Sequence, residues 1–267
     1  MKLAFMTANY VAEALQYRPG LEWGEYQEET FRKFHSSSFA YEFERLLDRI
    51  KQMGFEALEL WVAHLDPIQA TSEMIQTAVS LLERYEMQVV SYTPSFRTPN
   101  AGRDEIKKVY ETAKAIGAPV LANGFHASNA SVIHELGKQY GIKYGIENHP
   151  EKNAQEVLQQ IEGFAPWIGS TLDTGWFAMQ GYDPVQAVQE LKEHLVHVHL
   201  KDVVSAGGHD SCTLGQGIVP ISDVIRQLKA INYQGALTIE HEPMDHDPSD
   251  EVRQSLIYVR TLLNGGL

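Results

Sequence analysis

The chain has 267 residues, of which 43% are hydrophobic and 21% charged, and its formal net charge is −13. These proportions are typical of a globular protein, and no stretch approaches the roughly 18 consecutive apolar residues that a membrane helix needs. The acidic charge disfavours nucleic acids as partners, because their binding depends on Lys and Arg side chains that neutralise phosphates.

Nothing near the N-terminus has the apolar run of an export signal. The single cysteine, Cys212, cannot form a disulfide within the chain, which is in keeping with a reducing compartment. We therefore expect a cytoplasmic protein without membrane association, and we assign no role to Cys212.

Short apolar segments rich in β-branched residues alternate with longer segments of helical periodicity, which is typical of parallel βαβ units. Eight such strand-like segments follow one another, at residues 3–10, 57–63, 87–93, 119–124, 144–148, 168–173, 195–201 and 236–241. We predict helices at 39–53, from near Pro67 to 85, at 103–116 and at 249–263, with further helical segments between the later strands. Glycines directly follow the first and third of these helices, as at many helix ends.

Residues 11–38 show no clear periodicity but contain several aromatic side chains. We expect an irregular stretch that packs over the mouth of the fold as a lid or covers its edge as a structural loop.

The order of elements predicts one (β/α)8 barrel over residues 1–267, since no Pro/Gly/Ser-rich linker divides the chain. A doubly wound open sheet is the competing architecture. It would normally carry a Gly-rich phosphate loop after the first strand, where this chain instead reads Thr7-Ala8-Asn9-Tyr10.

Four of the predicted strands end in residues that can bind a metal, namely Glu147, Asp173, His199 and Glu240. Strand ends meet at the C-terminal mouth of such a barrel, where active sites form. Three buried carboxylates in one place are unstable without a positive charge. We therefore expect one divalent metal ion, for which Mn²⁺ is favoured and Mg²⁺, Co²⁺ or Zn²⁺ would also suit the ligands.

Strand alternation refines these assignments, because side chains two residues apart face the same side. His197 faces inward like His199, and we expect it to hydrogen-bond beneath the ligands. Glu240 and Glu242 share one parity, so alternation leaves either as the ligand. His64 and His149 follow their strands where a substrate could reach them, although a structural or loop role fits each equally well.

At these residues the chain resembles the xylose isomerase-like barrel superfamily, which contains sugar isomerases and epimerases related to endonuclease IV. The resemblance lies in four segments, Ile-Glu147-Asn-His, Leu-Asp173-Thr-Gly, His199-Leu-Lys-Asp and Ile-Glu240-His-Glu. They look like the four metal ligands of the sugar epimerase branch, on strands five to eight. Leu214-Gly215-Gln216-Gly217 also looks like that family's approach to strand eight.

The resemblance implies proton transfer beside the carbonyl of a small sugar or polyol, through a metal-stabilised enediolate. Glu147 and Glu240 are then the candidate catalytic carboxylates, in addition to being ligands. Such a protein would be an isomerase or epimerase of carbohydrate metabolism. A metal-dependent lyase resembling inosose dehydratase, or a barrel that binds sugar or metal without catalysis, are the alternatives.

Three departures from the family pattern bear on the substrate. Trp176 stands where relatives commonly have His, and could stack on a sugar ring. No Arg follows Asp202, so its contact with substrate hydroxyls is either missing or replaced by Lys201 or His209. The triplet at 209–211 differs from that of endonuclease IV-like enzymes, which disfavours a repair enzyme. The motifs are compatible with a free or phosphorylated sugar, and with a monomer or a homo-oligomer.

Overall fold

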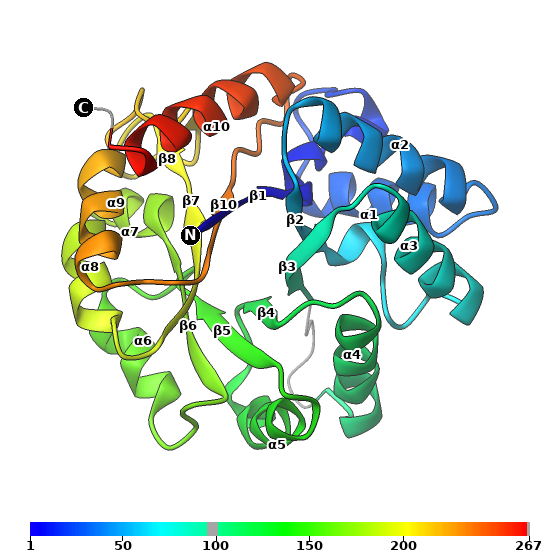
Figure 1. The fold of residues 1–267 in the computed structure, drawn as a ribbon, viewed down its shortest axis with the longest axis horizontal. Helices are drawn as coiled ribbons and strands as arrows, with labels where there is room; N and C mark the ends of the chain where they lie inside the picture. Colours follow the sequence, from blue (N-terminus) through cyan, green and yellow to red (C-terminus); the bar gives the residue numbers. More distant parts are fainter. Residues whose placement is uncertain (95–100, 266–267) are drawn as a thin grey trace.

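The computed structural model describes residues 1–94 and 101–265. Eight parallel strands pair into a closed barrel in the order β1-β10-β7-β6-β5-β4-β3-β2, and helices surround it (Figure 1). The barrel strands are β1 (Lys2–Met6), β2 (Ala57–Trp61), β3 (Gln88–Thr93), β4 (Val120–Asn123), β5 (Lys143–Glu147), β6 (Ile168–Asp173), β7 (Leu195–Leu200) and β10 (Ala236–Ile239). The predicted (β/α)8 architecture is confirmed.

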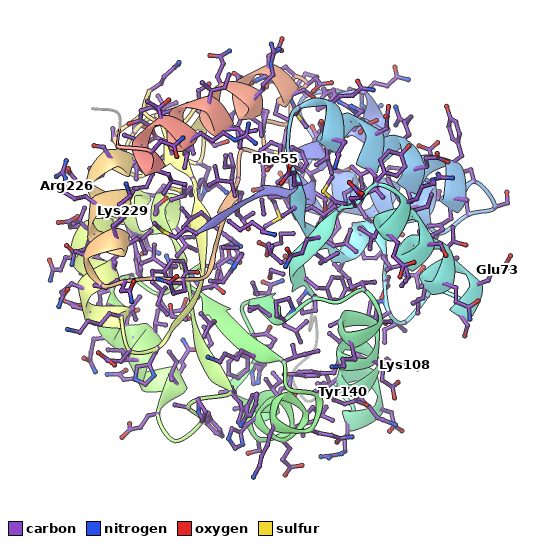
Figure 2. All side chains as sticks on the ribbon, in the orientation of Figure 1. Phe55, Glu73, Lys108, Tyr140, Arg226 and Lys229 are labelled. Carbon is purple, nitrogen blue, oxygen red and sulfur yellow. The ribbon has the colours of Figure 1, made fainter. Side chains whose placement is uncertain are left out.

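The helices follow the strands around the ring, and their bounds are α1 (Trp23–Phe34), α2 (Phe39–Gln52), α3 (Ser72–Arg84), α4 (Arg103–Ala115), α5 (Ala130–Tyr140), α6 (Ala154–Ile161), α7 (Thr174–Met179), α8 (Pro184–Leu191), α9 (Ile221–Ala230) and α10 (Ser249–Leu263). Buried side chains recur at helical spacing, such as Phe43 and Leu47 of α2. Charged side chains such as Glu73, Lys108 and Arg226 point outward from the ring (Figure 2). Within the described ranges, no helix combines the length and apolar content required to cross a bilayer.

The first strand ends earlier than its apolar run predicts. Extended backbone stops at Met6, and Thr7–Tyr10 form a turn of 3-10 helix. The reason is Asn9, whose amide donates to Ile239 O at 3.2 Å and accepts from His241 N at 2.9 Å. The chain therefore bends at the mouth to tie the end of β1 to the segment that leaves β10.

The stretch 11–38 is not irregular throughout, so this expectation was wrong. It contains α1, whose start is fixed by a capping box in which Glu22 N donates to the Glu25 carboxylate at 2.9 Å. Trp23 packs on Trp61 at the end of β2, with ring centroids 5.8 Å apart. The segment thus reaches the mouth of the barrel as an ordered helix.

The helix expected to start near Pro67 begins later. Thr71 is the N-cap of α3, and its hydroxyl accepts from Met74 N at 3.2 Å. A threonine in this position satisfies a free backbone N–H, which the proline does not do.

The interior of the barrel changes from apolar to polar along its axis. Small side chains fill the end where the strands begin, with Ala4, Ala57 and Val90 in one buried cluster and Ala236 packed against it. Near the other end the interior holds buried polar groups such as His197. The chemistry of the molecule is therefore concentrated where the strands end.

Candidate metal centre and active site

Four side chains from four neighbouring strands converge at the mouth of the barrel. Glu147 ends β5, Asp173 ends β6, His199 lies in β7, and Glu240 directly follows β10. Each offers one ligand atom, and these atoms all lie within 4.8 Å of one another. All four residues are at most 3% exposed. The structure thus brings together the four residues singled out in the sequence.

Asp173 is oriented by the helix that follows it. Its carboxylate caps α7, with Oδ1 accepting from Trp176 N at 2.8 Å. The other oxygen, Oδ2, is buried without a hydrogen-bond partner among the described residues. Burial and the nearby charge of Glu240 raise the pKa of Asp173 to about 7.

The two ring nitrogens of His199 face different partners. Nδ1 lies 2.9 Å from Glu147 Oε1 and 2.9 Å from Glu240 Oε2, on the side of the cluster. Nε2 lies 3.1 Å from each carboxylate oxygen of Glu59, deeper in the barrel. Although burial would lower it, the pKa of His199 is raised well above its ordinary value by these carboxylates.

Glu59 in β2 is a functional candidate that the sequence reading missed. It is fully buried and also contacts His197 Nε2 at 2.6 Å and accepts from Thr93 Oγ1 at 2.7 Å. The positive charges of His199 and His197 outweigh burial and hold the pKa of Glu59 well below its usual range. The signal was a lone glutamate inside the apolar strand run Leu58-Glu59-Leu60. His197 hydrogen-bonds beneath the cluster, in the position expected for it.

Lys201 neutralises part of the negative charge at the mouth. Its Nζ donates to Glu240 Oε1 at 2.7 Å and to Glu242 Oε2 at 3.0 Å. Burial would raise the pKa of Glu240, but Lys201 and His199 outweigh burial and lower it. Glu242 lies outside the four-residue cluster, and burial raises its pKa to about 8. A Cβ on Gly175 would lie 2.8 Å from Lys201 Cγ, so the absence of a side chain there lets the lysine stem pass.

A cavity of about 680 Å³ opens above this cluster. Glu147 and Glu240 lie in its floor, and Trp176 forms part of its wall. The Trp176 ring meets His149 edge-on at 4.7 Å and His209 at 5.5 Å between centroids. Three of the expected substrate contacts, His149, Trp176 and His209, therefore line one side of this cavity. Lys201 also lines it, although its ammonium group is engaged by the two glutamates.

His64 lies elsewhere. Its ring is 1% exposed and packs edge-on against Phe34 and Trp61, with centroids 4.4 Å and 5.6 Å away. Burial lowers the pKa of His64 to about 3. The ring is absent from the cavity lining given by the described residues, so the structure does not bring His64 to the other predicted contacts.

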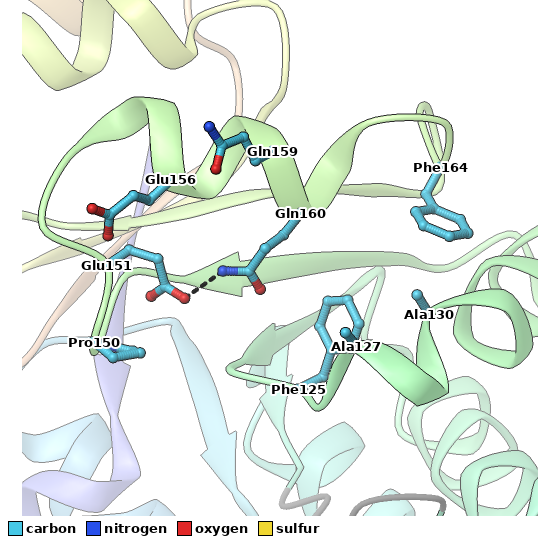
Figure 3. A pocket seen from close by; sticks show the side chains of 9 residues that line it. All are labelled: Phe125, Ala127, Ala130, Pro150, Glu151, Glu156, Gln159, Gln160 and Phe164. Carbon is cyan, nitrogen blue, oxygen red and sulfur yellow. Dashed lines mark hydrogen bonds between the residues drawn. The ribbon is translucent and has the colours of Figure 1, made fainter.

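A second cavity of about 450 Å³ lies between the loops that follow β4 and β5 (Figure 3). Phe125 and Phe164 line it together with Glu151, whose carboxylate accepts from Gln160. None of the four converging ligands lines this cavity, so we assign the chemistry to the larger one.

The cluster at the mouth fits a divalent cation. One buried carboxylate oxygen in it, Asp173 Oδ2, has no hydrogen-bond partner in the described part of the chain, and Glu240 Oε2 has, among the described residues, only the ion-pair contact with His199 Nδ1. Unpaired oxygens of this kind are costly in a buried site unless a cation binds them. Three carboxylates and one imidazole nitrogen form a donor set suited to Mn²⁺ and similar ions.

Comparisons with known proteins agree with the fold. Residues 47–262 match the family model described as xylose isomerase-like TIM barrel. The chain is 23% identical over 250 residues to fructoselysine 3-epimerase of Escherichia coli O157:H7, a match covering 79% of this chain and 90% of that protein. It is 26% identical over 174 residues to inosose dehydratase of Mesomycoplasma hyopneumoniae, covering 55% and 57%. The solved D-allulose 3-epimerase from Methylomonas sp. superposes with a TM-score of 0.72 at 16% identity, covering 98% of each chain.

Proposed function

Because this chain belongs to the xylose isomerase-like TIM barrel family, we propose that it is a metal-dependent sugar isomerase or epimerase. The observation that carries the proposal is the pair of carboxylates, Glu147 and Glu240, which flank His199 Nδ1 at 2.9 Å each in the floor of the cavity. Two carboxylates at one site can remove a proton from carbon and return it.

Glu147, Asp173, His199 and Glu240 would hold the ion, for which we favour Mn²⁺. When bound, a divalent ion polarises a carbonyl and stabilises the negative charge that develops when the adjacent C–H loses its proton. His199 would offer Nδ1, since its Nε2 faces Glu59. This arrangement, with one ring nitrogen toward the ion and the other toward a carboxylate, fixes the orientation of a ligand histidine.

Glu147 and Glu240 would exchange the proton with the substrate carbon. Lys201 and His199 keep Glu240 ionised, and His149 together with His199 lowers the pKa of Glu147 despite its burial. Both carboxylates are therefore ionised near neutral pH, which is the form that a general base requires. The flat face of Trp176 suits the C–H face of a sugar, with His149 and His209 beside it for hydroxyl groups.

A lyase is the second candidate, because one relative is named as an inosose dehydratase. The same proton abstraction would then be followed by loss of a hydroxyl group from the neighbouring carbon. A different product distinguishes the two reactions, since the lyase yields a dehydrated compound and the isomerase or epimerase yields an isomer.

Incubation with Mn²⁺ and a panel of ketoses and inososes in D₂O tests the proposal. We expect deuterium to enter the carbon beside the carbonyl, seen by NMR, with Glu147→Gln and Glu240→Gln each slowing this at least about 100-fold. Glu73→Gln, on the exposed face of α3, serves as the matched control and should leave the rate unchanged. Absence of exchange over the whole panel, or full exchange in both active-site variants, contradicts the proposal.

A further inference from the structure

A second group of metal-ligating side chains lies where the chain passes from β10 to α10. His241 Nε2 is 3.1 Å from Glu251 Oε2, and His246 Nε2 is 2.7 Å from the same oxygen. The three atoms lie within 4.8 Å of one another. None of these residues belongs to the cluster at the mouth of the barrel, so the group needs its own explanation.

The opposite ring nitrogens of both histidines are also occupied. His241 Nδ1 is 2.8 Å from Ser211 Oγ, and His246 Nδ1 is 2.6 Å from Asp245 Oδ1. Histidines that bind metals are held in this way, with one nitrogen toward the ion and the other fixed by a hydroxyl, carbonyl or carboxylate. Both rings are therefore already oriented with Nε2 toward a shared point.

The group is closed on one side and open on the other. The His241 side chain is 2% exposed, while those of Glu251 and His246 are 33% and 48% exposed. An ion could enter from solvent and keep water as a further ligand, which is the usual arrangement where a protein supplies only three ligands. Two imidazoles and one carboxylate suit Zn²⁺, Co²⁺ or Ni²⁺ better than Mg²⁺ or Ca²⁺, which prefer oxygen ligands alone.

We propose that His241, His246 and Glu251 form a second binding site, selective for borderline transition-metal ions such as Zn²⁺. The site stands independently of the reaction proposed above. An ion there takes the place of the close contacts between the two imidazoles and Glu251, and it links the segment after β10 to the first turn of α10.

The site also adjoins the wall of the catalytic cavity. Ser211 lines the cavity, and its Oγ contacts His241 Nδ1 and accepts from Glu242 N at 3.2 Å. Fixing His241 with an ion would therefore fix Ser211 and the backbone of Glu242. The expected consequence is a more rigid cavity wall, without a direct role for the second ion in proton transfer.

Zn²⁺ titration by calorimetry tests the proposal, using a Glu147→Gln, Asp173→Asn variant that removes two ligands of the cluster at the mouth. We expect about one Zn²⁺ per chain, and we expect further His246→Ala or Glu251→Gln substitution to weaken this binding at least about 100-fold. His126→Ala removes an exposed histidine of another loop and should leave the affinity unchanged.

The Glu147→Gln, Asp173→Asn variant could fail to fold, so the same substitutions are also made in the otherwise unaltered chain. There the Zn²⁺ stoichiometry should fall from two to one with His246→Ala, and Co²⁺ should lose one of two sets of visible absorption bands. If the chain with both sites binds Zn²⁺ with the same stoichiometry and affinity after His246→Ala and Glu251→Gln, the second site does not exist.

Discussion

At the residue scale, the site depends on which atom of each side chain faces the cluster. His199 presents Nδ1 to Glu147 and Glu240 only because Glu59 occupies its Nε2 side. Glu59 is itself held by Thr93. The direction in which the histidine offers its lone pair is therefore set by a residue on the far side of the barrel, in β2.

Replacing Glu59 with Gln should weaken metal binding while the barrel still folds. An amide keeps one acceptor but loses the charge that fixes the two imidazoles, and losses of such supporting carboxylates typically lower metal affinity about 10- to 100-fold. Titration of Mn²⁺ against a competing chelator measures this change. An affinity equal to that of the Glu73→Gln control would show that Glu59 does not position His199.

The residues of the site differ in how well the sequence alone predicts them. Asp173 could be predicted because it ends a clear strand, and barrel geometry sends every strand end to one mouth. Glu59 lies inside a strand, where its partners His197 and His199 are 138 and 140 residues away along the chain. The residues next to Glu59 in the sequence give no indication of these two partners. The role of Lys201 was similarly hidden, because its contacts with Glu240 and Glu242 depend on side-chain direction.

At the scale of elements, the loop after β7 is organised by one carboxylate. Asp202 accepts hydrogen bonds from the backbone N–H groups of Gly215 at 2.8 Å, Gly217 at 3.0 Å and Val219 at 3.0 Å. A Cβ on Gly217 would lie 2.3 Å from the same carboxylate, which explains the glycine in this turn. Asp202 is also the first residue of β8 (Asp202–Val203). This short strand pairs with β9 (Ser211–Cys212) in the wall of the cavity.

Asp202→Ala should lower the free energy of unfolding by about 3 kcal/mol, because several backbone N–H groups, that of buried Val219 among them, lose a charged acceptor at once. Urea unfolding followed by circular dichroism measures the loss. Asp210→Ala, at an exposed position before β9, is the matched control and should change stability by less than about 0.5 kcal/mol. Equal stabilities for the two variants would contradict this account of the loop.

Helix α1 was not predicted because hydrophobic periodicity does not reveal it. Its buried positions, Tyr26, Thr30, Phe31 and Phe34, have helical spacing, but one of them is polar and acidic residues surround them. Thr30 can be buried because its hydroxyl donates to Val11 O at 3.1 Å, a contact made only in the folded chain. The periodicity was therefore masked by a residue whose burial depends on a tertiary partner.

At the scale of the whole molecule, the polar mouth is a source of instability that the rest of the barrel must offset. Most of the buried apolar residues form one continuous cluster that extends around the ring, apart from the small cluster of Ala4, Ala57 and Val90. Against this, burial raises the pKa of Asp173 to about 7 and that of Glu242 to about 8. Metal-free protein at high pH must therefore keep carboxylates ionised where they prefer to be neutral.

The metal-free protein should lose thermal stability as pH rises from 6 to 9. The folded chain binds protons at Asp173 and Glu242 more tightly than the unfolded chain, whose carboxyls titrate near pH 4. Their contribution is thus fully present below about pH 4 and is lost as pH rises through about 7 and 8. Melting curves after chelator treatment measure this slope, and saturating Mn²⁺ should reduce it because the ion requires ionised Asp173. A slope that is flat without metal, or unaffected by Mn²⁺, would contradict the assignment.

The most direct test of the proposed metal centre is anomalous X-ray diffraction from a crystal of the protein grown with Mn²⁺. We expect an anomalous peak at the mouth of the barrel, within about 2.3 Å of Glu147, Asp173, His199 Nδ1 and Glu240. Soaking such a crystal in Zn²⁺ should add a second peak at His241, His246 and Glu251. A well-ordered structure without a Mn²⁺ peak among the four ligands at the mouth would contradict the proposed metal centre.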